Sequence, residues 1–335
     1  MDADLVTPRW WASQLAVANE LRQQAQPSES ALDSYTGQWQ SDKRSGIGVV
    51  RCANGDVYIG EWAAGVRSGA GACAFGSGDL YEGTWKEDRM HGTGALMQST
   101  GQLFVGSFAA GAPHGPGRCH YTDGSVYEGE FSEGVRDGAG RLKLPSGAVY
   151  VGRWRRDMRD GHGTMTGVDG TVYSGMWLGD QRHGQGRLVV GGVQVFEGAW
   201  FDNERCGYGV GPAPEPALSL DDTHLHASRH HLLGAVQSEG EALRYEGEWR
   251  GGRPNGHGRL VRAPGGASQE PAYVGQWVEG ERRGHGVGLL ASADVYEGGW
   301  EHGEPHGFGV AHVRTGVAGV GVGVERLVAT ALRPA

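Results

Sequence analysis

A fixed spacing of 23 residues constrains this chain more than any other feature of its sequence. A tyrosine or phenylalanine opens each 23-residue copy eight times in succession, and three further copies follow after a break. The opening residues are Tyr35, Tyr58, Tyr81, Phe104, Tyr127, Tyr150, Tyr173 and Phe196, then Tyr245, Tyr273 and Tyr296. A period of this size predicts a stack of repeated supersecondary units rather than a globule built around one core.

Each copy has the same internal pattern when its opening aromatic residue is numbered position 0. Glycine stands at positions 2, 11 and 13, and tryptophan or phenylalanine at position 4, in all eleven copies. Position 7 is always glycine, aspartate or asparagine. Because strand side chains alternate, positions 0, 2 and 4 share one face of a strand, and position 7 suits a left-handed turn. The pattern predicts one β-hairpin per copy.

The expected fold is all-β: an elongated, twisted, single-layer antiparallel stack of hairpins preceded by a short N-terminal helix. Aromatic rings would stack from copy to copy, because the glycine at position 2 leaves room for a ring against the backbone. The residues expected to form this stacking core are Tyr58, Trp62, Tyr81, Trp85, Tyr127, Tyr150, Trp154, Tyr173, Trp177, Trp249, Trp277 and Trp300.

The copies divide the chain into five parts. These are an N-terminal segment (1–34), copies one to eight (35–211), an inserted loop containing proline and histidine (212–244), copies nine to eleven (245–316), and a closing strand with a tail (317–335). Valines alternate over residues 320–324 and predict the closing strand, and residues 325–332 suit a short helix. Residues 232–236 could supply a second strand missing from copy eight, which would let the stack continue past the loop.

The N-terminal segment contains a predicted helix that begins near Thr7 and Pro8, a favourable pair at a helix start. Its apolar residues recur at helical spacing. One interpretation is a capping helix over the first hairpin, since terminal repeats need a cover. The alternative is a helix that docks in a partner's groove, with Trp10, Trp11 and Leu15 as its anchors.

The inserted loop brings together four histidines, His224, His226, His230 and His231. Histidines can ligate a metal, but no cysteine accompanies them. A solvated surface loop is therefore expected, with no metal site.

Charge and absent motifs argue against several function classes. The net charge is −9 and the pI about 5.9, which disfavours non-specific binding to nucleic acid or anionic membranes. The four cysteines form no disulfide or metal spacing, as in reducing compartments, and no targeting signal is recognised. No phosphate loop or nucleophile motif occurs. We expect a cytoplasmic protein with no catalytic residue, no cofactor and no enzymatic activity.

The run Tyr-Glu-Gly-Glu-Trp from Tyr245 to Trp249, followed by Gly-x-x-x-Gly-x-Gly, resembles the MORN repeat (membrane occupation and recognition nexus). The resemblance extends to every copy. It implies a fold found in flagellar and other cytoskeletal scaffolds, including radial spoke heads. Similar arrays occur in junctional membrane proteins and as appendages of some lipid kinases and methyltransferases.

Two functions are expected from this resemblance. The first is a structural scaffold in a microtubule-based cytoskeleton, the axoneme of a cilium or flagellum, with other axonemal proteins or a second copy of the chain as partners. The alternative is a phosphoinositide-binding membrane adaptor. Its local support is a basic cluster of Arg153, Arg155, Arg156 and Arg159, since such clusters attract these lipids. Two aspartates inside the cluster, Asp157 and Asp160, weaken this alternative.

Overall fold

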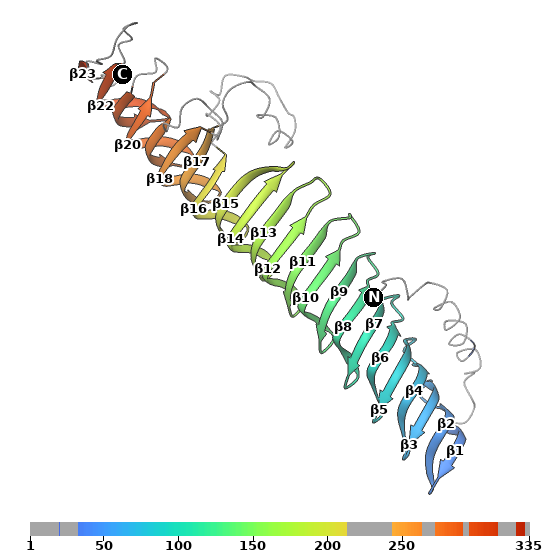
Figure 1. The fold of residues 1–335 in the computed structure, drawn as a ribbon. Coiled ribbons are helices and arrows are strands. Elements are labelled where there is room, and N and C mark those ends of the chain that lie inside the picture. The colour runs from blue at the N-terminus through green and yellow to red at the C-terminus, as the bar shows by residue number, and fades with distance from the viewer. Residues whose placement is uncertain are drawn as a thin grey trace, which may run out of the picture. The chain divides into compact units, whose positions relative to one another are not determined.

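The computed structural model describes residue 20 and residues 33–212, 243–262, 272–290, 295–313 and 326–331. The chain forms two compact units, Met1–Val168 and Asp169–Ala335. Strands joined by turns make up the described part of both (Figure 1). The predicted N-terminal helix and the valine strand over 320–324 lie outside the described residues.

Unit 1 is a single-layer antiparallel sheet in which each strand pairs with the next one along the chain. Its strands are β1 (Ser34–Gln40), β2 (Lys43–Arg51), β3 (Val57–Ala63), β4 (Val66–Ala74), β5 (Leu80–Lys86), β6 (Arg89–Met97), β7 (Leu103–Ala109), β8 (Ala112–His120), β9 (Val126–Ser132), β10 (Val135–Lys143), β11 (Val149–Arg155) and β12 (Met158–Thr166).

Unit 2 has the same organisation, with each strand paired antiparallel to its successor. Its strands are β13 (Val172–Leu178), β14 (Gln181–Val190), β15 (Val193–Phe201), β16 (Glu204–Pro212), β17 (Leu243–Arg250), β18 (Arg253–Arg262), β19 (Tyr273–Val278), β20 (Glu281–Leu289), β21 (Val295–Glu301), β22 (Glu304–Val313) and β23 (Arg326–Ala331).

The turn predicted at position 7 is confirmed. Positions 6 and 7 form a two-residue loop in every copy, and both residues have positive φ; Ala64 and Gly65, for example, have φ of 52° and 97°. Two positive φ values define the type I′ turn, whose twist matches that of the flanking strands. This geometry explains why position 7 is restricted to residues that tolerate a left-handed backbone.

The glycine at position 11 occupies a bulge. In copy two Gly60 pairs with Gly71 while Trp62 pairs with Arg67, so three residues of β4 stand opposite one residue of β3. Gly69, at the centre of these three, has a φ of 78°, and position 11 has positive φ in every copy. The bulge releases the backbone from regular pairing and demands glycine there.

The inserted loop does not interrupt the strand pairing of unit 2. Copy eight already has its second strand, β16, and β16 pairs directly with β17, where Gly207 lies opposite Trp249. The expectation that residues 232–236 supply a missing strand is therefore wrong, because no strand is missing.

The C-terminal end also differs from expectation. The short helix predicted over residues 325–332 is wrong, because β23 is a strand that pairs antiparallel with β22. The reason is tertiary: the edge of β22 offers unpaired backbone groups, and pairing with them outweighs a weak local preference for helix.

Candidate functional site

Aromatic rings at positions 0 and 4 form a ladder on one face of each unit. Within a unit, each position-0 ring stands edge-on to the position-4 ring of its own copy and to that of the next copy in the same unit. The Tyr58 ring centroid lies 5.3 Å from Trp62 and 5.2 Å from Trp85, with interplanar angles of 89° and 82°. This T-shaped geometry is the favourable one for aromatic pairs.

The structure places all twelve predicted stacking residues in these ladders, and none of them is more than 5% exposed. The end of the ladder in unit 1 behaves differently. Trp39 occupies position 4 of the first copy, has no preceding copy to cover it, and is 60% exposed. The predicted partner anchors Trp10, Trp11 and Leu15 lie outside the described residues.

The paired glycines at positions 2 and 13 make room for the ring at position 0. A Cβ atom on Gly94 would lie 2.5 Å from the Tyr81 hydroxyl, and one on Gly83 would lie 2.6 Å from the Gly94 Cα atom. The Tyr81 hydroxyl donates a hydrogen bond of 2.9 Å to the carbonyl of Thr84. Burial raises the pKa of Tyr81, so the hydroxyl remains a donor at neutral pH.

Arginine at position 9 is a component of the ladder that our sequence analysis missed. The Arg67 Cζ atom lies 4.3 Å above the Trp85 ring of the next copy, and its Nε atom lies 3.1 Å from Asp88 Oδ1. The sequence carries a detectable signal: seven copies have arginine at position 9, and each is followed by tryptophan at position 4 of the next copy.

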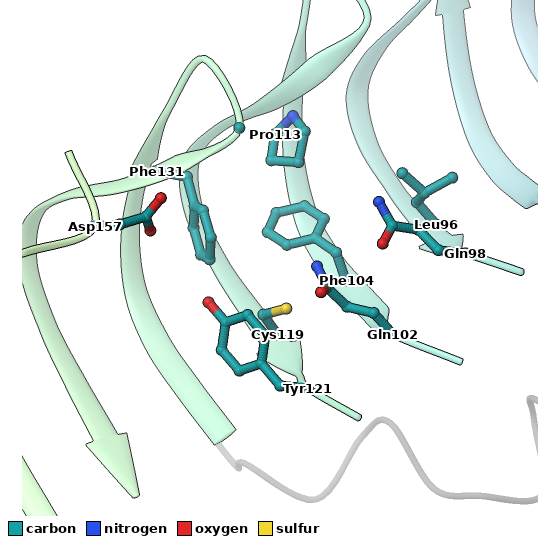
Figure 2. A pocket seen from close by; sticks show the side chains of 10 residues that line it. Leu96, Gln98, Gln102, Phe104, Pro113, Cys119, Tyr121, Phe131 and Asp157 are labelled. Carbon is teal, nitrogen blue, oxygen red and sulfur yellow. The ribbon is translucent and has the colours of Figure 1, made fainter. Parts of the chain in front are cut away.

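The ladder of unit 1 has a gap where copies four and five meet. Position 9 of copy four is Pro113, and the next copy has the smaller Phe131 at position 4 and Gly134 at position 7. Without the arginine, the indole and the aspartate of other copies, a hollow of about 330 Å³ opens beside the Phe104 ring (Figure 2).

The hollow has an apolar floor and a neutral polar rim. Phe104 and Phe131 form the floor, while Gln98, Gln102 and Tyr121 contribute polar groups. Burial raises the pKa of the Tyr121 phenol, so it stays protonated near neutral pH. This chemistry suits an apolar or aromatic side chain of a partner better than a charged ligand.

A buried thiol and an engaged carboxylate complete the lining. Burial raises the pKa of Cys119 to about 11, so its thiol stays neutral. Asp157 lies at the margin of the hollow, where its Oδ1 atom accepts a 2.9 Å hydrogen bond from Arg136 Nε in an ion pair. Neither group presents a free charge to the hollow.

Part of the basic cluster proposed for lipid binding already interacts with other side chains of the protein. The Arg155 Nη2 atom lies 3.6 Å from Asp160 Oδ1, and the Arg159 Cζ atom lies 5.8 Å from the centre of the Tyr150 ring. Two of the four guanidinium groups therefore interact with the chain itself.

Within the described ranges, no three histidine, cysteine, aspartate or glutamate side chains gather closely enough to hold a metal ion. The four histidines of the inserted loop lie outside those ranges. The described part of the chain also contains no helix with the length and apolar character needed to span a membrane.

A family model described as "MORN repeat" matches the chain eleven times. The matched residues are 35–57, 58–80, 81–101, 104–126, 127–149, 150–172, 173–189, 196–210, 245–267, 273–287 and 296–312. These matches begin at the same eleven aromatic residues that define the copies. No curated protein matches the chain.

Solved structures give weak matches. The TCP domain of Drosophila melanogaster SAS-4 (dCPAP), in complex with a proline-rich motif of Ana2 (dSTIL), is 14% identical over 50% of this chain and 91% of that chain, with a TM-score of 0.30. The TCP10 domain of Danio rerio CPAP, in complex with a STIL peptide, is 11% identical over 79% and 93%, with a TM-score of 0.33. TM-scores this low do not establish a shared fold.

Proposed function

Because the chain belongs to the MORN-repeat family, we propose that it is a non-enzymatic scaffold that binds other proteins through its repeat sheet. One observation carries this proposal. Every described strand from β1 to β22 belongs to a repeat hairpin. Each unit is thus a regular sheet that presents side chains at fixed intervals, as a surface for protein partners does.

We place this scaffold in a microtubule-based cytoskeleton, as a component of a ciliary or flagellar axoneme in a complex similar to a radial spoke. The support is the resemblance of the array to cytoskeletal MORN proteins. The partners would be axonemal proteins, and a second copy of the chain is a further candidate. The protein would work in the cytoplasm without a cofactor.

The hollow at copies four and five is the contact point that we assign to a protein partner. Position 9 is Pro113 here instead of arginine, and the floor of the hollow consists of Phe104 and Phe131. An apolar side chain of a partner would contact these two rings and displace water from them.

The test is imaging of a tagged copy in ciliated cells before and after detergent extraction. We expect the wild-type protein to be retained on axonemes. The triple variant Pro113→Arg/Phe131→Trp/Gly134→Asp restores the residues of other copies, fills the hollow, and should be released while its unfolding midpoint is unchanged or raised.

A matched control is Pro254→Arg, which adds an arginine at position 9 of copy nine, ahead of Trp277. This variant should be retained like the wild type. Free diffusion of the wild-type protein after gentle permeabilisation would rule out the scaffold. Retention of the triple variant on axonemes would agree with the scaffold function but would show that the hollow is not the contact point.

A phosphoinositide adaptor remains the alternative. Arg153, Arg155 and Arg156 are the exposed members of its basic cluster, and Arg155 pairs with Asp160. With Arg155 and Arg159 engaged, the cluster falls short of the four to eight basic residues typical of such sites. Flotation of the protein with phosphoinositide liposomes at low salt, abolished by Arg153→Gln/Arg156→Gln, would favour this function over the scaffold.

A further inference from the structure

The face of unit 1 opposite the aromatic ladder, here called the back face, changes character along the sheet. On β3 to β7 it carries a patch of apolar side chains, and Val57, Ala74, Leu80, Met97 and Leu103 lie opposite one another on neighbouring strands. Ala95 lies beside this row, opposite Glu82. We define the back patch as Val57, Ala74, Leu80, Ala95, Met97 and Leu103. On β8 to β10 the same face carries more charges, including an ion pair of 3.2 Å between Arg118 and Glu128.

Three residues of the back patch are buried although no described strand lies over them. Val57, Ala74 and Ala95 are 2%, 3% and 2% exposed, whereas Val149 and Lys143, which hold the positions of Val57 and Ala74 in later copies, are half-buried and exposed, respectively. The outer face of a single layer does not bury its own side chains to this extent. Something outside the described strands covers β3 to β7.

Residues 1–32 have the length and the position to provide this cover. A helix over residues 8–21 would be roughly 21 Å long, at 1.5 Å per residue, which matches four to five strand spacings of ~4.8 Å. The Asp33 carboxylate accepts a 2.9 Å hydrogen bond from the backbone N–H of Ala53. This bond holds the start of the described chain against the β2–β3 loop, immediately before Val57.

The open end of the ladder is exposed in the described part of the chain. Trp39 is 60% exposed and the strand that carries it, β1, has almost no buried side chain. A cap over the first hairpin would bury both. The apolar stripe of the N-terminal segment is therefore better matched to the back patch than to the end of the stack.

We propose that residues 1–32 fold back across β3 to β7 and cover the back patch with the stripe that contains Trp10, Trp11 and Leu15. The chain itself then occupies this apolar surface and shields it from other proteins. The hollow on the aromatic face is left open for a partner. This inference does not depend on the cellular role proposed above.

The test is hydrogen–deuterium exchange of the full-length protein, read at the backbone amides of residues 8–21. We expect these amides to be protected in the wild type. Ala74→Arg places a charge between Val57 and Leu80 in the back patch and should accelerate their exchange about tenfold or more. Val151→Arg makes the same kind of change at an exposed site of the same face and should leave their protection unchanged.

A second variant tests whether the loss of protection is caused by unfolding of the sheet. Leu15→Glu changes only the covering segment, so the strands of unit 1 should keep their own protection while residues 8–21 lose theirs. Unprotected amides in the wild type, or equal protection in Ala74→Arg and the wild type, would overturn the proposal. Protection that disappears on dilution would assign the cover to a second copy and would overturn it as well.

Discussion

At the scale of single residues, the glycines of this chain are required for two different structural reasons. Gly94, at position 13, has an ordinary backbone conformation, and a side chain there would strike the Tyr81 ring. Gly111, at position 7, has a φ of 96° and no heavy atom within 4 Å of an added Cβ atom. The first glycine is required by packing and the second by the backbone.

Alanine substitutions should separate these two requirements. Gly94→Ala should lower the free energy of unfolding by about 3 kcal/mol, because the Tyr81 ring has no free space to move into. Gly111→Ala should lower it by only about 1 kcal/mol, the strain of a left-handed alanine. Urea denaturation of both variants measures the difference, and equal losses would contradict the packing role of Gly94.

Glu82 provides a pH-dependent effect. Burial on the back face raises the pKa of Glu82 above its ordinary value of 4.5. The folded state therefore binds the proton of the Glu82 carboxyl more tightly than the unfolded state does. Protonated Glu82 contributes stability that is present below about pH 4.5 and is lost as pH rises through the raised pKa.

Glu82→Gln removes this penalty and should raise the urea midpoint at pH 7, with no comparable gain at pH 4. Glu128 stands at the same position two copies later and pairs with Arg118 at 3.2 Å, so Glu128→Gln should give no gain at pH 7. A gain for Glu82→Gln that is equally large at both pH values would show that burial of its charge is not the cause.

At the scale of the hairpin, the position-9 arginine joins each element to the next. Besides stacking on Trp85, the Arg67 side chain donates a 2.8 Å hydrogen bond to the Asp88 carbonyl, and the Asp88 carboxylate accepts from the Arg67 backbone N–H at 2.9 Å. The turn of one hairpin is thus held by the second strand of the preceding hairpin.

Arg67→Met should lower the free energy of unfolding by about 2 kcal/mol, because it removes the ring contact and charge-assisted hydrogen bonds together. Arg118→Met is the matched control, because Arg118 makes an exposed ion pair on the back face. Its loss should stay under about 1 kcal/mol. Equal losses in chemical denaturation would mean that the arginine ladder adds nothing beyond surface charge.

At the scale of the whole molecule, contacts run between successive copies, so stability is expected to be a sum of local terms. Trp154 contacts Tyr127 and Tyr150, with centroids 5.4 and 5.2 Å away, and is 4% exposed. Its loss would weaken the coupling between two consecutive copies. The exposed Trp39 stacks on Tyr35 of its own copy and has no preceding copy to contact.

Trp154→Ala should lower the free energy of unfolding by roughly 3–5 kcal/mol and split the thermal transition into two. Trp39→Ala should leave a single transition near the wild-type midpoint. Differential scanning calorimetry distinguishes these outcomes, and one unchanged cooperative transition for Trp154→Ala would contradict the nearest-neighbour description.

Within one hairpin, the sequence alone was sufficient to predict the local structure. The alternation of positions 0, 2 and 4 and the turn residue at position 7 predict the strand, its aromatic face and the turn, because these features depend on backbone geometry over a few consecutive residues. The twelve residues chosen for the stacking core follow from the same local pattern, and the structure buries all of them.

Features between hairpins required the folded structure. The stacking of Arg67 on Trp85, the hollow beside Phe104 and the burial of Ala95 all depend on residues of more than one copy. Their proximity depends on the register between successive hairpins, on the bulge at position 11 and on what lies over each face. None of these is encoded in the 23-residue spacing, because burial is a property of neighbours in space and the spacing specifies only neighbours along the chain.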